Sequence, residues 1–350
     1  MREYRIAAIP GDGIGTEVIA AGLKVLDVLA QRDRGFRLNV EHFPWSSDYY
    51  KRHGHYIPAG GLDRLKTFEA IFFGAVGAPD VPDHVSLWGL RLPICQGFDQ
   101  YANVRPARVL PGITSPLKGG EAIDWVIVRE NSEGEYSGSG GRVHQGLPEE
   151  LATETSVFTR TGVARIHRFA FELAQTRPRR NLTLVTKSNA QRHGMVMWDE
   201  IFYEVAKDYP KVETQRILVD AVTTLMVGKP RSLDTIVATN LHADILSDLA
   251  AALSGSLGIA PTANLNPERK FPSMFEPIHG SAFDIAGRGI ANPIATFWTA
   301  SMMLEHVGEK DASVRLMKAI ETVTAKKIHT PDLGGEATTE IVTSAVCDAI

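Results

Sequence analysis

Cysteine is scarce in this chain of 350 residues, which contains only Cys95 and Cys347. The two residues lie far apart in the sequence and form no C-x-x-C pattern. A disulfide framework and a structural zinc site both need more cysteines at closer spacing, so the sequence argues against both. The composition fits a reducing compartment, and we expect a cytoplasmic protein.

A strong charge imbalance and a long apolar run are also missing. The 37 Lys and Arg residues nearly balance the 41 Asp and Glu residues, and the net charge of −4 provides no basic field for nucleic acid. No apolar stretch approaches the roughly 20 residues needed to span a bilayer, and the N-terminus carries no signal-peptide pattern. We expect a soluble protein that binds neither nucleic acid nor membranes. Its length exceeds that of one compact core and predicts two lobes.

A strand, a glycine-rich turn and a helix open the chain and predict an α/β domain. Residues 4–9 are an apolar run rich in β formers, PGDGIGTE forms the turn, and Thr16 is expected to cap a helix over 17–30. The turn is similar to a dinucleotide fingerprint, but Thr16 replaces the last glycine of G-x-G-x-x-G, and no clear ribose-binding acid ends the second predicted strand. We therefore expect a glycine-rich turn near a ligand rather than a standard Rossmann motif.

Four polar residues each follow a predicted strand, and in an α/β protein such residues meet at the carboxyl edge of a sheet, where ligands bind. They are Arg129, Lys187, Asp220 and Asn240, after strands at 125–128, 183–186, 217–219 and 235–238. Tyr136 lies seven residues after Arg129 in RENSEGEYSGSGG, a polar, glycine-rich segment that is expected to be a loop. A solvated loop without function is the alternative for that segment.

The remaining elements follow from periodicity and composition. Residues 79–97 mix apolar residues with prolines and are expected to be loop-like. The other predicted strands are 38–43 and 70–73, and the other predicted helices are 62–68, 159–175, 197–208, 293–307 and 339–349.

Asp244 and Asp248 lie four residues apart in TNLHADILSDL, which has helical spacing. Both carboxylates therefore leave the same face of a helix, one turn apart, where they raise each other's pKa and can hold a cation. An ordinary solvated helix surface is the alternative for such a pair. Leu241, Ile245 and Leu249 repeat at the same interval and are expected to form a buried stripe beside the acidic one.

Several motifs together resemble one family along essentially the whole chain. They are PGDGIG, NVRPAR, VREN with Tyr136, TKSN, VDA, TNLHADILSD and EPIHGSAFDIAGRGIANP. The chain is similar to the β-decarboxylating dehydrogenases of 2R-hydroxy acids, which include isopropylmalate, isocitrate, homoisocitrate, tartrate and D-malate enzymes. The segments SLWG, FDQYANVRP, VRENSEGEYSG, TKSNAQ and NLNPERKFPS look most like the tartrate and D-malate branch. The alternative within the family is 3-isopropylmalate dehydrogenase, which would share the chemistry and differ in the pocket.

The resemblance implies an α/β fold of the isocitrate/isopropylmalate dehydrogenase type, with two domains, a doubly wound sheet and no standard Rossmann fingerprint. Residues 1–101 and 255–350 would form the cofactor domain, and residues 102–254 would form the substrate, metal and dimerisation domain. It also implies a homodimer with shared active sites, in which Asp220 and Lys187 reach the site that contains Asp244 and Asp248 of the partner.

For the metal, the resemblance implies the ligands Asp220, Asp244 and Asp248, an all-oxygen set that suits Mg²⁺ or Mn²⁺ and disfavours zinc. Lys187 would take the proton of the substrate 2-hydroxyl as hydride leaves for NAD, and Tyr136 would protonate the carbon after CO₂ is lost. The sequence leaves open whether tartrate is decarboxylated and whether K⁺ is required.

The substrate carboxylates would be bound by Arg105 and Arg129 through forked, charge-assisted hydrogen bonds. One departure from the family concerns Cys95, which occupies the position of a further substrate-binding arginine in the isopropylmalate and isocitrate enzymes. Arg91, one helical turn earlier if the segment is helical, is the predicted replacement. The alternative is that Cys95 packs in the core and Arg91 is solvated.

For the cofactor, the resemblance implies NAD and a loop that surrounds the adenosine. Asp284 would accept hydrogen bonds from both ribose hydroxyls and repel a 2′-phosphate, and the uncharged Ile285 fits the same preference. Capping of a turn by His279 and a plain helix start at Asn292 are the structural alternatives for those two residues. The full predicted set is His279, Gly280, Ser281, Ala282, Asp284, Ile285, Asn292 on the adenine side, and Asn189 near the nicotinamide.

Overall fold

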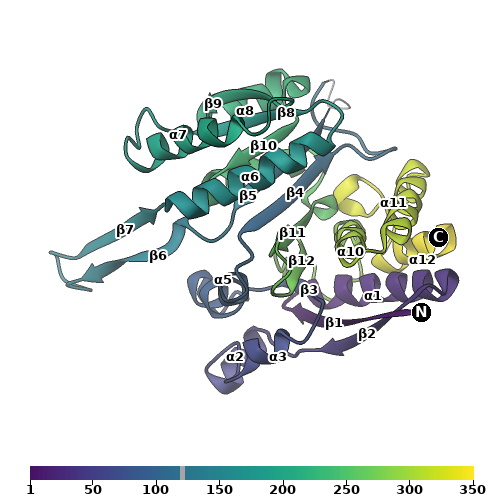
Figure 1. Ribbon diagram of the computed structural model, residues 1–350. Coiled ribbons are helices and arrows are strands. Elements are labelled where there is room, and N and C mark those ends of the chain that lie inside the picture. The colour runs from purple at the N-terminus through teal and green to yellow at the C-terminus, as the bar shows by residue number, and fades with distance from the viewer. Residues whose placement is uncertain (119–122) are drawn as a thin grey trace. The chain divides into compact units, whose positions relative to one another are not determined.

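The computed structural model describes residues 1–118 and 123–350 (Figure 1). The chain divides into two compact units, which we describe in turn. Unit 1 contains residues 1–100, the segment from Arg108 up to the undescribed residues, and residues 251–350. Unit 2 contains residues 101–107 and the chain from the end of the undescribed segment to Ala250.

The two units differ from the predicted domains mainly in one segment. Residues 108–118 were expected in the middle domain but belong to unit 1. Leu110 and Ile113 are buried in the core of that unit, which explains the assignment.

The sheet of unit 1 has the strand order β2-β1-β3-β12-β11. The strands are β1 (Arg2–Gly11), β2 (Phe36–His42), β3 (Ala70–Ala75), β11 (Pro261–Leu265) and β12 (Ser273–Pro277). Neighbouring strands are parallel except β11 and β12, which are antiparallel.

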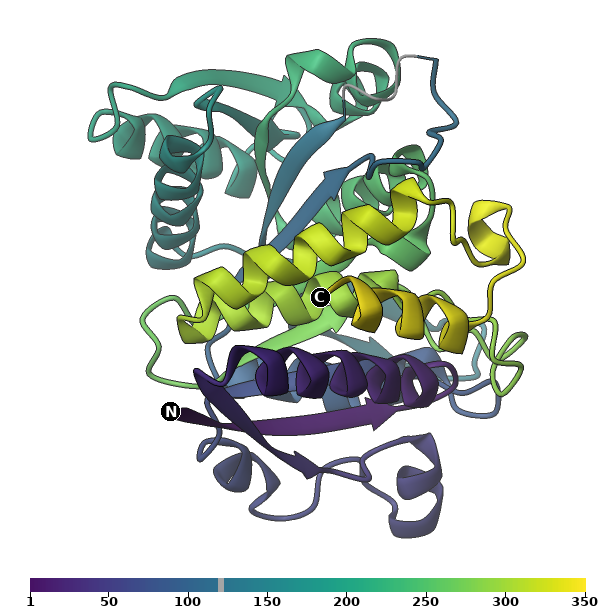
Figure 2. The ribbon, with the colours of Figure 1, turned by 90° about the vertical axis from the view of Figure 1, so that its right-hand side faces the viewer.

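Helices and loops cover both faces of this sheet. Along β1, Ile6 and Ala8 lie in one hydrophobic core, whereas Ala7 and Ile9 lie in another, as the alternation of a strand requires. The first core contains α1 (Gly15–Asp33), α10 (Ile294–Val307), α11 (Lys310–Ala325) and α12 (Thr339–Ala349). Figure 2 shows the purple α1 beside the yellow α12 in this layer. The second core lies beneath α2 (Ser47–His53), α3 (Gly61–Leu65) and α5 (Leu92–Gly97).

The sheet of unit 2 has the strand order β4-β5-β10-β8-β9. These strands are β4 (Ala102–Arg108), β5 (Asp124–Glu130), β8 (Asn181–Thr186), β9 (Glu213–Leu218) and β10 (Thr235–Ala238). Strand β10 is parallel to both β5 and β8, and β8 is parallel to β9. The helices are α6 (Arg160–Thr176), α7 (Gly194–Ala206), α8 (Val219–Gly228) and α9 (Asn240–Ser254).

A two-stranded antiparallel hairpin extends from unit 2. It consists of β6 (Gly134–Val143) and β7 (Leu151–Val157), and every residue of β7 is exposed (Figure 1). RENSEGEYSGSGG was predicted to be a loop, but Tyr136 and the glycines after it lie in β6. The strand was missed because a glycine-rich sequence has little β propensity.

Two further sequence predictions are wrong. Residues 79–97 are not a loop but contain α4 (Asp83–Ser86), a π-helical turn (Leu87–Arg91) and α5. Leu90 and Ile94, four residues apart, are fully buried, and Pro93 is tolerated in the first turn of α5. Thr16 does not cap α1, because the helix begins at Gly15 and the Thr16 hydroxyl instead donates to the carbonyl oxygen of Gly13.

The other predicted elements are present with shifted ends, and β10 matches residues 235–238. Helices α2, α8 and α11 and strands β7, β11 and β12 were not predicted. Within the described residues, the helices are too short or too polar to cross a bilayer.

Candidate active site

Helix α9 presents the two predicted aspartates at the end of β10. The helix starts at Asn240, and its buried side contains Ala243, Leu246 and Ala250. Leu241 and Ile245 were predicted to be buried but are 37% and 56% exposed. Leu241 and Ile245 have the helical spacing of an apolar stripe, but within one chain their side chains face away from the core.

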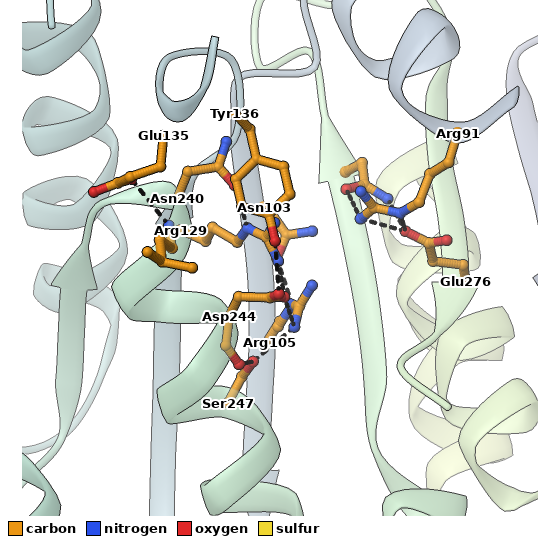
Figure 3. Close-up of polar contacts among 12 residues, drawn as sticks. Arg91, Asn103, Arg105, Arg129, Glu135, Tyr136, Asn240, Asp244, Ser247 and Glu276 are labelled. Atoms are coloured by element: carbon orange, nitrogen blue, oxygen red, sulfur yellow. Dashed lines mark hydrogen bonds and ion pairs between the residues drawn. The ribbon is translucent and has the colours of Figure 1, made fainter. Parts of the chain in front are cut away.

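Asp244 is the centre of a polar cluster that is contributed by four elements of unit 2 (Figure 3). Its Oδ1 atom accepts a hydrogen bond from the Arg129 guanidinium and lies 3.2 Å from Nη1 of Arg105. The Tyr136 hydroxyl lies 3.2 Å from the other carboxylate oxygen. The sequence predicted that these residues share one site, and the fold brings them together from α9, β5, β4 and β6.

Neighbouring side chains orient the two arginines. Nε of Arg129 donates to Oδ1 of Asn240 at 2.8 Å, and Nε of Arg105 donates to Oδ1 of Asn103 at 2.9 Å. Nη1 of Arg105 also donates to the Ser247 hydroxyl at 2.6 Å. Both guanidinium groups are buried, so these contacts fix their direction. Ser247 was not predicted, although its position three residues after Asp244 places it on the same helical face.

The surroundings of Asp248 differ from those of Asp244. Asp248 is exposed to solvent, and among the described residues its carboxylate has no hydrogen-bond or ion-pair partner. The protein around the carboxyl group raises its pKa, and the Asp244 carboxylate adds to that rise while Arg105 opposes it. A carboxylate without a partner, next to a second carboxylate, is a suitable ligand for a hard cation.

Lys187 and Asp220 form an ion pair with each other, at the ends of β8 and β9. The ammonium group of Lys187 holds the pKa of Asp220 below its usual range. No group of three or more candidate metal ligands forms within the described part of the chain. The predicted set of three aspartates is therefore incomplete within one subunit.

The predicted cofactor loop packs against the glycine-rich turn of unit 1. The amide of Ile14 donates to the carbonyl oxygen of Ser281 at 2.8 Å, and a Cβ atom on Gly13 would lie 2.0 Å from that oxygen. Gly13 also has a positive φ of 55°, so any other residue would be strained as well as blocked. Ile285 packs against a small hydrophobic cluster that contains Ile14.

Polar atoms of this loop are available for a ligand. Nε2 of His279 and Oγ of Ser281 are buried and have no hydrogen-bond partner in the described structure. Burial lowers the pKa of His279, so its ring is neutral at physiological pH. The side chain of Asp284 is exposed, as is Gly280. Ala282 adopts a positive φ of 40°, which is unusual for a residue with a side chain.

Asn292 and His279 also make local contacts of the kind expected if Asn292 only starts a helix and His279 only caps a turn. Oδ1 of Asn292 accepts from the Ile294 amide at 3.0 Å at the start of α10, and its Nδ2 atom donates to Asp332 at 2.9 Å. The Nδ1 atom of His279 lies 3.0 Å from the carbonyl oxygen of Gly280. Asn189, in the turn after β8, is exposed in unit 2.

Cys95 and Arg91 lie within unit 1. Cys95 is buried in the hydrophobic core beneath α5, as expected if this residue serves only in core packing. Arg91 is not solvated: its guanidinium lies 2.7 Å from Oε1 of Glu276 and donates to Oδ1 of Asn264 at 3.3 Å (Figure 3). Both members of the ion pair are largely buried.

Comparison with known proteins agrees with this fold. The family described as "Isocitrate/isopropylmalate dehydrogenase" matches residues 5–350. The solved structure of isocitrate dehydrogenase from Methylococcus capsulatus superposes with a TM-score of 0.89 at 35% identity and covers 99% of both chains. The chain belongs to the isocitrate/isopropylmalate dehydrogenase family and has its fold.

Two relatives indicate the branch of the family. The chain is 71% identical to a probable tartrate dehydrogenase/decarboxylase of Agrobacterium vitis, over 100% of this chain and 98% of the relative. It is 50% identical to D-malate dehydrogenase [decarboxylating] of Escherichia coli K12, over 100% of this chain and 99% of that protein.

Proposed function

We propose that this protein oxidises small 2R-hydroxy acids, tartrate and D-malate, with NAD and a divalent metal ion, with or without loss of CO₂. The observation that carries the proposal is the cluster of Arg105, Arg129 and Tyr136 around Asp244. It combines two buried cations for carboxylates, a hydroxyl for proton transfer and an acidic group for a metal. The names of the relatives supply the substrate class.

Substrate binding is assigned to the two arginines. The guanidinium groups of Arg105 and Arg129 are held by Asn103, Ser247 and Asn240, so binding a dicarboxylate costs little side-chain entropy. Their charge-assisted hydrogen bonds would be strong because both groups are shielded from water.

The residues fit Mg²⁺ or Mn²⁺. Asp244 and Asp248 lie on one face of α9, and Asp248 has no protein partner among the described residues. Asp220 of a second subunit would complete the oxygen ligand set. When bound, the cation would polarise the substrate 2-hydroxyl and stabilise negative charge that develops on that oxygen.

Proton transfer is assigned to Lys187 and Tyr136. As a neutral amine, Nζ of Lys187 would accept the proton of the 2-hydroxyl during oxidation. Its ion pair with Asp220 supports the proposal that the two residues reach the site together. The Tyr136 hydroxyl would donate a proton to the carbon from which CO₂ has left. The guanidinium of Arg129 lies 5.2 Å from the centre of the Tyr136 ring, on the same polar cluster.

NAD fits the loop of unit 1. The buried polar atoms of His279 and Ser281 lack partners in the described structure, and the Asp284 carboxylate is exposed and available to ribose hydroxyls. Gly13 lets the glycine-rich turn approach the backbone of this loop at Ser281. Bound NAD would accept the hydride from C2.

A homodimer with shared sites is supported by the exposed apolar surface of unit 2. Ile245 on α9 and Val227 on α8 are both more than half exposed. The β6–β7 hairpin also exposes Val143 and Leu151, and a two-stranded sheet is only marginally stable alone. A second copy would cover these residues and bring Lys187 and Asp220 to the Asp244 cluster. We place the enzyme in the cytoplasm, which agrees with a chain that contains only two cysteines, both buried.

The proposal that two subunits share each active site is tested by mixing the variants Lys187→Ala and Asp244→Asn, each of which is expected to be inactive alone. A heterodimer contains one site with neither substitution, so activity should return when subunits exchange. Subunit exchange must be verified with differently tagged chains. Absence of activity in purified heterodimers would contradict shared sites.

The substrate assignment is tested by initial rates with NAD and Mn²⁺ on D-malate, the tartrate isomers, isocitrate and 3-isopropylmalate, with and without K⁺. We expect D-malate or a tartrate isomer to give the highest kcat/KM. Faster turnover of 3-isopropylmalate would instead assign the chain to 3-isopropylmalate dehydrogenase.

A further inference from the structure

Glu130 is a buried carboxylic acid to which the reaction above assigns no role. It is the last residue of β5, directly after Arg129, and only 2% of it is exposed. The chain then turns and enters β6, which carries Tyr136. Glu130 therefore lies on the short connection between two residues of the Asp244 cluster.

Three hydrogen bonds from this turn converge on the Glu130 carboxylate. Oε1 accepts from the amide of Ser132 at 2.9 Å and from its hydroxyl at 2.5 Å. Oε2 accepts from the amide of Glu133 at 2.8 Å. The carboxylate thus closes the turn in the way that an N-cap residue closes the start of a helix.

The same turn is attached to the helices that surround the cluster. The carbonyl oxygen of Glu133 accepts from Nδ2 of Asn240, the residue that also orients Arg129. The Ser132 hydroxyl accepts from Nη2 of Arg165 on α6 at 3.0 Å, and the Arg165 guanidinium lies over the Tyr101 ring at 4.0 Å. A change in the turn would therefore be transmitted to the cluster.

We propose that Glu130 is a positioning residue whose ionised carboxylate holds the turn and thereby places Arg129 and Tyr136 around Asp244. The catalytic consequence rests on the proposed function, whereas the effect on the turn does not. The three donors all require acceptor lone pairs, and a protonated carboxyl group replaces one acceptor position with a donor. Protonation of Glu130 should therefore loosen the turn.

Burial, hydrogen bonds and nearby charges determine the pH at which Glu130 is protonated and the turn loosens. Burial raises the pKa of Glu130 to about 7, and the hydrogen bonds from Ser132 and Glu133 oppose that rise. The Glu133 carboxylate raises the pKa further, while the Arg165 guanidinium reaches the far side of Ser132 from α6. The turn should be ordered above neutral pH and loosened as the pH falls below it.

The experiment compares the wild type with Glu130→Gln, Ser132→Ala and the control Glu200→Gln. Glutamine keeps the shape of Glu130, but its amide nitrogen cannot accept from Glu133. Glu200 is exposed on α7 and makes no hydrogen bond or ion pair within the residues that the structure describes. The pH dependence of kcat and KM for D-malate is measured together with amide hydrogen exchange in peptides covering Arg129 to Tyr136, corrected for intrinsic rates.

We expect the wild type and the control to lose exchange protection and kcat/KM as the pH falls through about 7. At high pH, kcat/KM of Glu130→Gln should be about 10-fold lower than that of the wild type, because one hydrogen bond to a charged group is lost. This variant should also lack the loss of protection and kcat/KM near neutral pH. Ser132→Ala should move the transition to higher pH, because the ionised form loses one donor.

Exchange protection in Glu130→Gln that equals the wild type at every pH would overturn the proposal. Retention of the same transition by that variant would also overturn it. If the exchange changes as expected but no hydroxy acid is oxidised, Glu130 positions the turn and the proposed function is wrong.

Discussion

Asp244 and Asp248 lie one helical turn apart, yet their surroundings predict opposite effects on stability when each is changed to asparagine. Asp244 balances the buried guanidinium groups of Arg105 and Arg129. Asp248 has no partner in the described structure, and its raised pKa shows that its charged form is disfavoured in the fold. The substitutions are otherwise matched, because each replaces a carboxylate with an amide of the same shape on the same helix face.

The expected magnitudes follow from burial and charge. Removing one partner of a fully buried ion pair costs about 3–5 kcal/mol. The Asp244 side chain is 35% exposed, so solvent screens part of the loss, and Asp244→Asn should lower the free energy of unfolding by about 1–3 kcal/mol. A raised pKa in the folded state means that the contribution of Asp248 is present at low pH and is lost as the pH rises through its folded pKa. Asp248→Asn should therefore be neutral or slightly stabilising at pH 7, by about 0.5 kcal/mol or less.

The assay is urea denaturation of both variants and the wild type, with and without Mn²⁺. Mn²⁺ at about 100 times its dissociation constant should stabilise the wild type by about 2.7 kcal/mol and should stabilise both variants far less. Equal destabilisation by the two substitutions in the absence of metal would refute the different surroundings that we assign to Asp244 and Asp248. Full stabilisation of either variant by Mn²⁺ would refute its role as a ligand.

Two further predictions concern the cofactor and the substrate pocket. Asp284→Ala should weaken NAD binding and relieve the rejection of NADP, measured as the ratio of kcat/KM for the two cofactors, and an unchanged ratio would exclude Asp284 as the discriminating residue. Cys95→Ala should be mild in activity, whereas Arg91→Ala should lower kcat/KM for D-malate about 10 to 100-fold if Arg91 binds substrate. Because Arg91→Ala also removes the ion-pair partner of the buried Glu276 carboxylate, thermal stability must be measured as well. A lower melting temperature with an unchanged KM would assign Arg91 to structure alone.

The sequence predicted those parts of the site that depend on strand ends and helical spacing. The four-residue strand β10 is bounded by polar residues and is fully buried, so its ends were predictable, and so was the helix that follows. Arg129 and Asn240 leave neighbouring parallel strands at the same edge, which is a property of the fold class rather than of this chain.

Other features depend on distant parts of the chain. Leu241 and Ile245 have the periodicity of a buried stripe but are exposed within one chain, and periodicity does not distinguish a core from a subunit interface. Glu130 is one of many acids in the sequence, and its burial becomes visible only when the turn after β5 is folded. Leu110 and Ile113 belong to unit 1 through contacts that no local pattern encodes.

The most direct test of the proposed reaction is its stoichiometry with D-malate. NADH formation and CO₂ release should be measured in the same reaction, with L-malate as the control substrate and with the metal removed by EDTA. We predict equal amounts of NADH and CO₂ from D-malate, little product from L-malate, loss of both products with EDTA and recovery of both with excess Mn²⁺. Undiminished turnover after complete metal removal, or no NADH from any 2R-hydroxy acid, would contradict the proposed function.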